Sequence, residues 1–183
     1  VNFPIYLSLA GGGSLNFEDS GGGRYIGSSS LINKLADETK SKEAAWYRDG
    51  FLPPGRDIFD IIWPRSELRP SAPENASIHF KTIDWWVMRS DFKSPEKVMV
   101  AGKAGMNNDP HHGHLDIGHF VVNWQEEYFI RDLGSGGYDE KYFDDMRFDY
   151  TVVSSAGHNV VVVNGEKQIS GKMRKQPWNF EVG

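Results

Sequence analysis

Cysteine is missing from this 183-residue chain, so disulfide bonds and thiolate metal ligands are both excluded. A metal ion would need histidine, aspartate or glutamate side chains as its ligands. Long apolar runs are also missing: no stretch approaches the length of a transmembrane helix, and no segment has the pattern of a signal peptide. We therefore expect no membrane partner. Because the chain begins with valine, we interpret it as a mature or excised piece, in which case a missing signal says little about export.

A surplus of positive charge is missing too. The formal net charge is −5, which does not suggest a nucleic-acid partner. Aromatic residues, in contrast, are abundant: 6 Trp, 7 Tyr and 11 Phe make up 13% of the chain. Aromatic rings stack on sugar rings in many all-β proteins, although they also fill protein cores. Composition alone therefore makes carbohydrate a weak candidate for the partner.

The first part of the chain has the pattern of helices and loops. Residues 28–50 combine serine N-cap candidates, helical spacing of apolar residues and a glycine stop, which predicts one helix. Residues 57–63 predict a second, short helix that ends before a proline. Two glycine clusters interrupted by aromatic residues predict an ordered loop or a hairpin over residues 1–27.

The rest of the chain has the pattern of an antiparallel β-domain. Segments rich in β-branched and aromatic residues predict successive strands over residues 77–90, 97–102, 114–124, 126–134, 148–155 and 158–165. A polar stretch with two prolines, residues 65–76, is the expected boundary. We therefore predict a helical unit over residues 1–70 and a β-domain over residues 71–183. The expected β-domain core contains Phe80, Trp86, Val121, Phe129, Val160 and Val162.

The most distinctive stretch is DPHHGHLDIGHF, residues 109–120, which holds four of the chain's six histidines. On a strand alternate side chains share a face, so His112, His114 and Asp116 would point the same way and His111 would not. Two imidazoles at positions i and i+2 can reach one cavity, where they bind a metal or act as acid and base. The alternative is a solvated strand face on which water satisfies the histidines. An expression tag is disfavoured, because such a tag is a continuous run at a terminus.

Further ligands are expected at the ends of other predicted strands. Asp132 in FIRDLG precedes a glycine turn, and His158 in SSAGHNVVVV opens a strand. Two neutral imidazoles and one carboxylate are a common zinc set, which can be structural or catalytic. Taken alone, Asp132 could instead cap a turn and His158 could bond the backbone. A cupin site, which also uses His-X-His, is disfavoured because residues 117–120 contain no glutamate.

Taken together, these motifs resemble the heparinase II/III-like polysaccharide lyases. The family pattern is His-X-His-X-Asp-X-Gly-X-Phe, then Asp-Leu-Gly or Asp-Pro-Gly, a tyrosine, and His-Asn leading into a strand. These elements occur here in the same order, and the resemblance is strong from about residue 78 to 168. Upstream, FKTIDWWVMRSDF resembles the strand pair that opens the family's β-domain. LNFEDSGGG resembles the family's GDS segment, with Glu18 where a glycine is expected.

The resemblance implies a fold and a reaction. The fold is mainly β: an antiparallel β-sandwich preceded by a short helical segment from the end of an incomplete α/α toroid. The reaction is β-elimination on a uronic-acid-containing polysaccharide, either heparin- or heparan-like, another glycosaminoglycan or alginate. The resemblance also implies that a catalytic tyrosine and an asparagine or histidine lie in the toroid, upstream of this chain. We therefore expect the rest of the parent chain to be a partner, and the isolated chain to be inactive.

The resemblance implies residue roles as well. His112 matches the catalytic histidine, and His114, Asp132 and His158 match the ligands of a zinc that is mainly structural. Asn159 matches a residue that supports the ligand histidine. Other candidates for lining the site or meeting an acidic sugar are Asp116, Tyr138, Arg89, Lys103 and Arg131, although each cation could instead be a solvated surface charge.

Two functions from different classes remain open. The first is an exported bacterial lyase, periplasmic or secreted, that degrades an acidic polysaccharide. The alternative is a non-catalytic carbohydrate-binding or scaffold β-sandwich with a structural metal. A metal-dependent hydrolase, with Asp116 activating a water, has the least support. A toroid with the expected catalytic groups upstream of the chain would favour the lyase.

Overall fold

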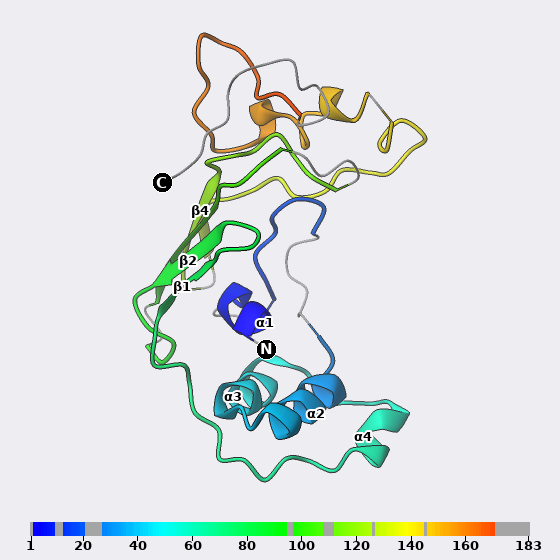
Figure 1. Ribbon diagram of the computed structural model, residues 1–183, viewed down its shortest axis with the longest axis vertical. Coiled ribbons are helices and arrows are strands. Elements are labelled where there is room, and N and C mark those ends of the chain that lie inside the picture. The colour runs from blue at the N-terminus through cyan, green and yellow to red at the C-terminus, as the bar shows by residue number, and fades with distance from the viewer. Residues whose placement is uncertain are drawn as a thin grey trace.

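The computed structural model describes residues 2–9, 13–20, 27–94, 97–107, 112–125, 127–144 and 146–170. Figure 1 shows three helices gathered at one end, a sheet in the middle, and loops with two short 3-10 helices at the other end. The five-stranded antiparallel sheet, with a short helical part before it, confirms the mainly-β class. No helix of the described residues is long and apolar enough to cross a membrane.

Two helices replace the single helix that we predicted over residues 28–50. Helix α2 covers Ser29–Thr39 and helix α3 covers Lys42–Phe51. The break comes at Lys40, whose φ of 55° is left-handed and ends α2. Ser41 then starts α3, because its side chain accepts a hydrogen bond from the backbone N–H of Ala44. The single-helix prediction was wrong, since a residue with left-handed backbone geometry cannot continue a right-handed helix.

Lys40 provides a test of this helix end. Lys40→Gly is expected to stabilise the protein by roughly 0.5–1 kcal/mol, because glycine adopts a left-handed conformation without the steric cost of a Cβ atom. The ion pair that is lost, 3.6 Å from Asp37, is exposed and contributes little. Urea unfolding would measure the change. As the matched control, Lys34→Gly in the exposed interior of α2 should destabilise by about 1 kcal/mol, and an equal effect at both positions would contradict this account of the break.

The N-terminal segment contains a helix that the sequence did not indicate. Helix α1, Asn2–Leu7, buries three consecutive apolar residues between the sheet and α3. The chain then turns back, and a bridge between Ser8 and Ser14 confirms the hairpin-like part of our expectation. Residues 21–26, which include the second glycine cluster, lie outside the described residues. Tertiary burial favours α1, since six residues are too few to form a stable helix alone.

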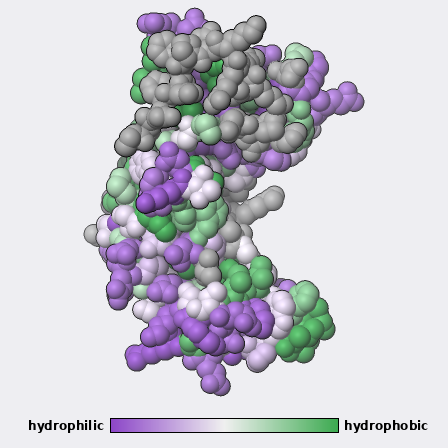
Figure 2. Space-filling model, viewed as in Figure 1, coloured by the Kyte–Doolittle hydropathy of each residue, from purple (hydrophilic) through white to green (hydrophobic). Residues whose placement is uncertain are grey.

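Helix α4, Ile58–Ile62, confirms the second predicted helix. Asp57 and Asp60 form a reciprocal capping box at its start. None of its residues is buried, and its isoleucines and Phe59 are exposed. Figure 2 shows these side chains as an apolar patch at the end of the molecule where Figure 1 places α4. The capping box therefore helps to stabilise α4, although the helix buries none of its residues in the core.

The sheet is an antiparallel meander in which each strand pairs with the next along the chain. Its strands are β1 Ser77–Phe80, β2 Trp85–Arg89, β3 Val98–Lys103, β4 Phe120–Trp124 and β5 Glu127–Ile130. One face packs on the N-terminal segment and buries Val87, Ala101 and Val121 completely. Of the core residues that we predicted, Val121 is buried, whereas Phe129 and Val162 are 65% and 52% exposed. These two expectations were wrong, because Phe129 lies on the uncovered face of β5 and Val162 lies outside the strands of the described residues.

Two of the predicted strands are not strands. Residues 148–155 form turns and parts of two 3-10 helices, η1 Arg147–Asp149 and η2 Ser155–Gly157. Within 158–165, only Val163 forms a bridge, to Glu166 across a turn with positive φ at the two residues between them. β-Branched composition suggested strands here, but the segment has no ladder partner among the described residues, and β-propensity depends strongly on such partners.

The predicted boundary, residues 65–76, has neither helix nor strand and is tied back to the helices. The backbone N–H of Ser66 donates to Asn33 Oδ1, and that of Ser71 donates to the Lys42 carbonyl. One apolar cluster includes residues from both sides of this connection, among them Ile5 and Phe92. The division at residue 70 stays a prediction.

Candidate functional site

The histidine-rich segment is a loop and not the strand that we predicted. Strand β4 begins only at Phe120, and residues 112–119 form bends and turns. The backbone N–H of Leu115 donates to Val153 O, and the Ser155 hydroxyl donates to Leu115 O. Gln168 donates to and accepts from the backbone of Ile117. Strand alternation therefore cannot explain which histidines point inward, and contacts with residues 153–168 hold the loop instead.

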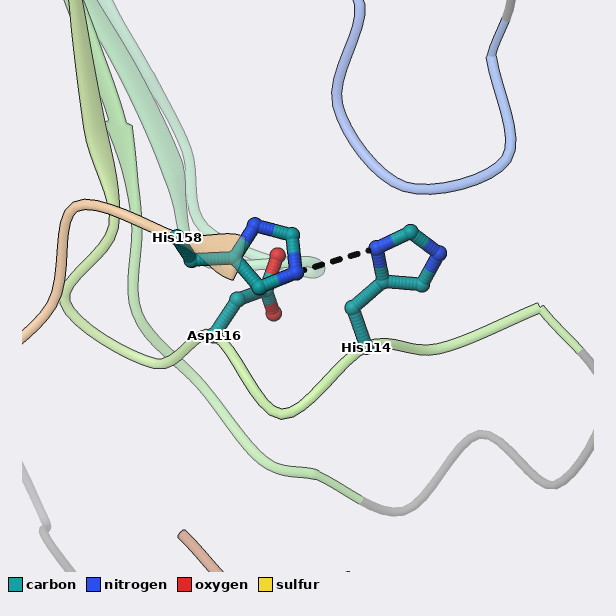
Figure 3. Close-up of side chains that lie close together, drawn as sticks. All are labelled: His114, Asp116 and His158. Carbon is teal, nitrogen blue, oxygen red and sulfur yellow. Dashed lines mark hydrogen bonds between the residues drawn. The ribbon is translucent and has the colours of Figure 1, made fainter. Parts of the chain in front are cut away.

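Three histidines and one aspartate form a continuous buried chain of contacts. The Nδ1 atom of His114 lies 3.2 Å from Nε2 of His158, whose Nδ1 lies 3.1 Å from Asp132 Oδ2. His119, which we had not singled out, brings its Nε2 within 2.8 Å of the same oxygen. The side chains of all four residues are 0% exposed. Figure 3 shows the His114 and His158 rings facing each other, with the Asp116 carboxylate beside them.

The Asp132 carboxylate in this chain of contacts is ionised at neutral pH. Burial would raise the pKa of Asp132, but hydrogen bonds from His119 and His158 outweigh it, so that the pKa lies well below its usual value. Burial lowers the pKa of His114 more than its bond to Asp19 raises it, which favours a neutral imidazole. Neutral histidine and charged aspartate are the forms that bind metals.

Hydrogen-bond accounting leaves a place for one positive charge between His114 and His158. The Nδ1 atom of His119 accepts from the Asn159 backbone, so its Nε2–H faces Asp132. His114 Nε2 donates to an ionised carboxylate, which leaves Nδ1 without a proton in the neutral ring. His158 must likewise donate from Nδ1 to Asp132. Either a second proton on His158 or a metal ion must then lie between the two facing nitrogens.

The spacing of those two nitrogens fits a metal. Two histidine nitrogens on a tetrahedral zinc, each at about 2.0–2.1 Å, lie roughly 3.3 Å apart, and the observed separation is 3.2 Å. Two groups of side chains could each hold a metal, because the ligand atoms in each group lie within 4.8 Å of one another. The groups are His114, Asp116 and His158, and His119, Asp132 and His158. His158 belongs to both groups, so a metal could use ligands from either.

The local charge balance is also negative. Lys103 Nζ lies 2.5 Å from Glu18 and 3.0 Å from Asp116, and it is 5% exposed rather than available to a sugar as we had suggested. Glu18 has a φ of 56°, which fits the expectation of glycine at this position. The connected groups comprise four carboxylates and two permanent cations, namely Glu18, Asp19, Asp116, Asp132, Lys103 and Arg147. A divalent cation would balance that charge.

Asp19 lies beside the buried cluster of histidines and Asp132, and the sequence did not single it out as a site residue. Its Oδ1 accepts from the Tyr142 hydroxyl at 2.6 Å and from His114 Nε2 at 3.1 Å. Its Oδ2 accepts from His112 Nδ1 at 2.8 Å and from the Arg147 guanidinium at 3.1 Å. Burial opposes the charge, but these donors lower the pKa of Asp19 to about 2. The sequence did contain a signal for Asp19, because the LNFEDSGGG segment that includes it resembles the family's GDS segment. No role had been assigned to that aspartate.

His112 is the accessible member of the site. Its side chain is 57% exposed, in contrast to the buried His114, and its ring meets the edge of Phe143 at 5.7 Å. Tyr138 is 55% exposed and packs on Tyr142 and Phe143, at ring distances of 4.7 and 4.9 Å. Desolvation and the charge of Asp19 raise the pKa of the Tyr138 phenol. His112 and Tyr138 therefore lie on one accessible aromatic surface beside the buried cluster.

Other predicted site residues lie elsewhere or support the backbone. Arg89 is 8% exposed and donates to the carbonyls of Tyr6 and Ser8 at the end of α1, and burial lowers its pKa to about 10. It is therefore in the core and not on a sugar-binding surface. Asn159 donates from its side chain to the carbonyls of Phe120 and Arg131, which joins the start of β4 to the end of β5.

Comparison with protein families gives one match. The profile described as heparinase II/III-like, C-terminal, matches residues 72–181, more than half of the chain. A search of curated proteins gave no match.

Solved structures share the fold at low sequence identity. A crystal structure of heparinase III has a TM-score of 0.63 and 16% identity, with 90% of this chain and 24% of that chain covered. A heparinase III with methylated lysines has a TM-score of 0.63 and 16% identity, with 91% of this chain and 23% of that chain covered. A mutant heparan sulfate lyase from Pedobacter heparinus has a TM-score of 0.51 and 17% identity, with 79% of this chain and 20% of that chain covered. The chain thus spans about a quarter or less of the length of these structures.

Proposed function

The chain belongs to the heparinase II/III-like C-terminal family, and we propose that it is part of a polysaccharide lyase that cleaves a uronic-acid-containing polysaccharide by β-elimination. The observation that carries this proposal is an exposed imidazole, His112, held by the ionised Asp19 beside a buried cluster of histidines and aspartates. Heparin, heparan sulfate, other glycosaminoglycans and alginate are the candidate substrates. The solved structures of similar fold include heparinase III and a heparan sulfate lyase.

The chemistry needs a base, an acid and a group that neutralises the substrate carboxylate. The base removes the proton at C5 of the uronate, the C4–O4 bond breaks, and the departing oxygen takes a proton, leaving a C4=C5 double bond. Charge builds up on the uronate carboxylate during this step and must be stabilised. Histidine is suited to proton transfer near neutral pH. We therefore assign His112 to help remove the C5 proton or to stabilise the negative charge that its removal leaves.

We further propose that a zinc ion binds at the buried cluster and holds its segments together. His114 and His158 would supply nitrogens and Asp116 or Asp132 an oxygen, in keeping with the spacing of these atoms. Asp19 and, where it is not a ligand, Asp132 would orient the imidazoles through their other nitrogens. With a zinc in place, its charge would offset the surplus of carboxylates, and the loop that carries His112 would be fixed to residues around His158.

The rest of the parent chain is the proposed partner. We propose that it supplies a helical toroid with the second half of the catalytic groups, and that the protein is periplasmic or secreted in a bacterium. A polysaccharide is too large to diffuse into a cell, so an enzyme that depolymerises it must meet it outside the cytoplasm. Fractionation of the source cells with an antibody against this chain would contradict the location if the protein stayed with the cytoplasm.

The lyase proposal is tested by product formation. The purified parent protein is expected to release 4,5-unsaturated sugar, followed by its ultraviolet absorbance, from at least one polymer in a panel of heparin, heparan sulfate, chondroitin sulfate and alginate. The 183-residue chain alone should give no measurable product from the same panel. Binding to a polymer without any unsaturated product from the parent would favour the alternative, a carbohydrate-binding or scaffold module.

A further inference from the structure

Asp19 is held more firmly than its position in a turn requires. Each of its two oxygens accepts two hydrogen bonds, from four side chains in two stretches of the chain, residues 112–114 and 142–147. Its side chain is only 7% exposed. A buried carboxylate with four donors has no acceptor capacity left over for rearrangement, so its orientation is fixed.

The four donors divide into those that hold Asp19 and the one that Asp19 holds. Tyr142, Arg147 and His114 are 0–2% exposed and have little freedom to move. His112 is different, because its side chain is 57% exposed and its backbone lies in a loop. A fixed carboxylate beside an exposed imidazole therefore restricts the direction of that ring through the Nδ1 hydrogen bond.

We propose that Asp19 is the positioning residue of His112, whose ring it orients so that Nδ1 carries the proton and Nε2 is the proton acceptor toward the substrate. The inference rests on the lyase function proposed above. The carboxylate can only accept, so a neutral His112 must place its single proton on Nδ1. Asp19 also bonds His114, and the cluster at His158 therefore stiffens the group that directs His112.

A double-substitution cycle in the parent protein separates this role from a structural one. Asp19→Asn keeps the size of the side chain, but its amide can donate to Nδ1 and so favour the wrong tautomer. We expect kcat to fall by about ten-fold or more with KM within about three-fold. In a His112→Ala background the same substitution should cost nothing further, because Asp19 acts through the missing ring. Equal losses in both backgrounds would overturn the proposal.

A second variant covers the case in which Asp19→Asn does not fold. Tyr142→Phe removes one donor to Asp19 Oδ1 and leaves the buried ring in place. Its loss of kcat should be smaller than that of Asp19→Asn and should also vanish in the His112→Ala background. The matched control is Asp91→Asn, the same change at a half-buried aspartate that accepts from the backbone of Lys93 and is not one of the site residues, which should leave kcat unchanged. A loss that persists without His112 would again overturn the proposal.

A chemical probe tests the inference if the parent has no lyase activity. Diethyl pyrocarbonate acylates the unprotonated imidazole nitrogen, and peptide mass spectrometry gives the rate at each histidine. At a pH where the rings are neutral, His112 should react at least about three-fold more slowly in Asp19→Asn, relative to the exposed His79 in the same sample. An unchanged ratio would refute the positioning role, whereas missing activity with a changed ratio would refute only the lyase function.

Discussion

Replacing His112 with alanine in the parent protein is expected to lower kcat by about 10²–10⁴-fold, the usual contribution of one positioned acid–base group. KM should change little, because the loss falls on the transition state and not on ground-state binding. Metal content and thermal stability should stay at wild-type values, since the His112 side chain is 57% exposed and does not belong to the groups that could hold a metal. Product absorbance under saturating substrate measures the rate.

Chemical rescue separates a lost catalytic group from a disturbed fold. Because His112 is accessible, added imidazole should restore part of the activity to His112→Ala. The matched control is His79→Ala, which removes another exposed histidine that pairs with an aspartate but lies on β1. That variant should keep the wild-type rate. Wild-type turnover in His112→Ala would show that the catalytic site is misassigned.

The sequence predicted the structure correctly where a residue type has a single physical reason to be present. The serine N-cap candidates placed the start of α2, because the Ser28 side-chain oxygen satisfies a free N–H at the helix start. The predicted successive strands over residues 114–124 and 126–134 contain β4 and β5, which pair with each other. The family motif correctly indicated that His114 and His158, 44 positions apart, meet in space.

The errors have a common physical origin in tertiary contacts. Strand parity was applied to residues 112–119, which form a loop because hydrogen bonds with Ser155 and Gln168 replace a β-ladder. Helix α1 exists because the sheet and α3 bury its apolar side, a reason that local propensity does not contain. His119 and Asp19 were missed for the same reason, as both act through partners far along the chain.

The sequence alone could not assign the carboxylate ligand of the candidate metal site. The sequence proposed His114, Asp132 and His158, and the structure places His158 between the other two. It also places Asp116 close to His114 and His158, and His119 close to Asp132, so two carboxylates compete for the role of ligand. Spacing along the chain cannot separate a ligand from a carboxylate that orients a ligand, because both touch the same imidazole.

His114→Ala is expected to lower metal content and stability together. The residue is 2% exposed, so its loss leaves a cavity and deprives Asp19 and His158 of a partner. We expect a loss of about 2–5 kcal/mol from the buried volume and the unpaired groups. Elemental analysis of protein purified without an affinity tag, together with thermal unfolding, measures both effects.

Metal removal completes this test, because a metal that binds only the folded state stabilises it in proportion to its occupancy. A chelator should lower the unfolding temperature of the wild-type protein, and added zinc should restore it. In His114→Ala neither treatment should have an effect, whereas the exposed control His79→Ala should respond like the wild type and lose less than about 0.5 kcal/mol. Wild-type protein that carries no metal would show that the buried histidines are held by protons and hydrogen bonds alone. A His114→Ala variant that still responds to zinc would show that the ion binds through His119, Asp132 and His158 instead.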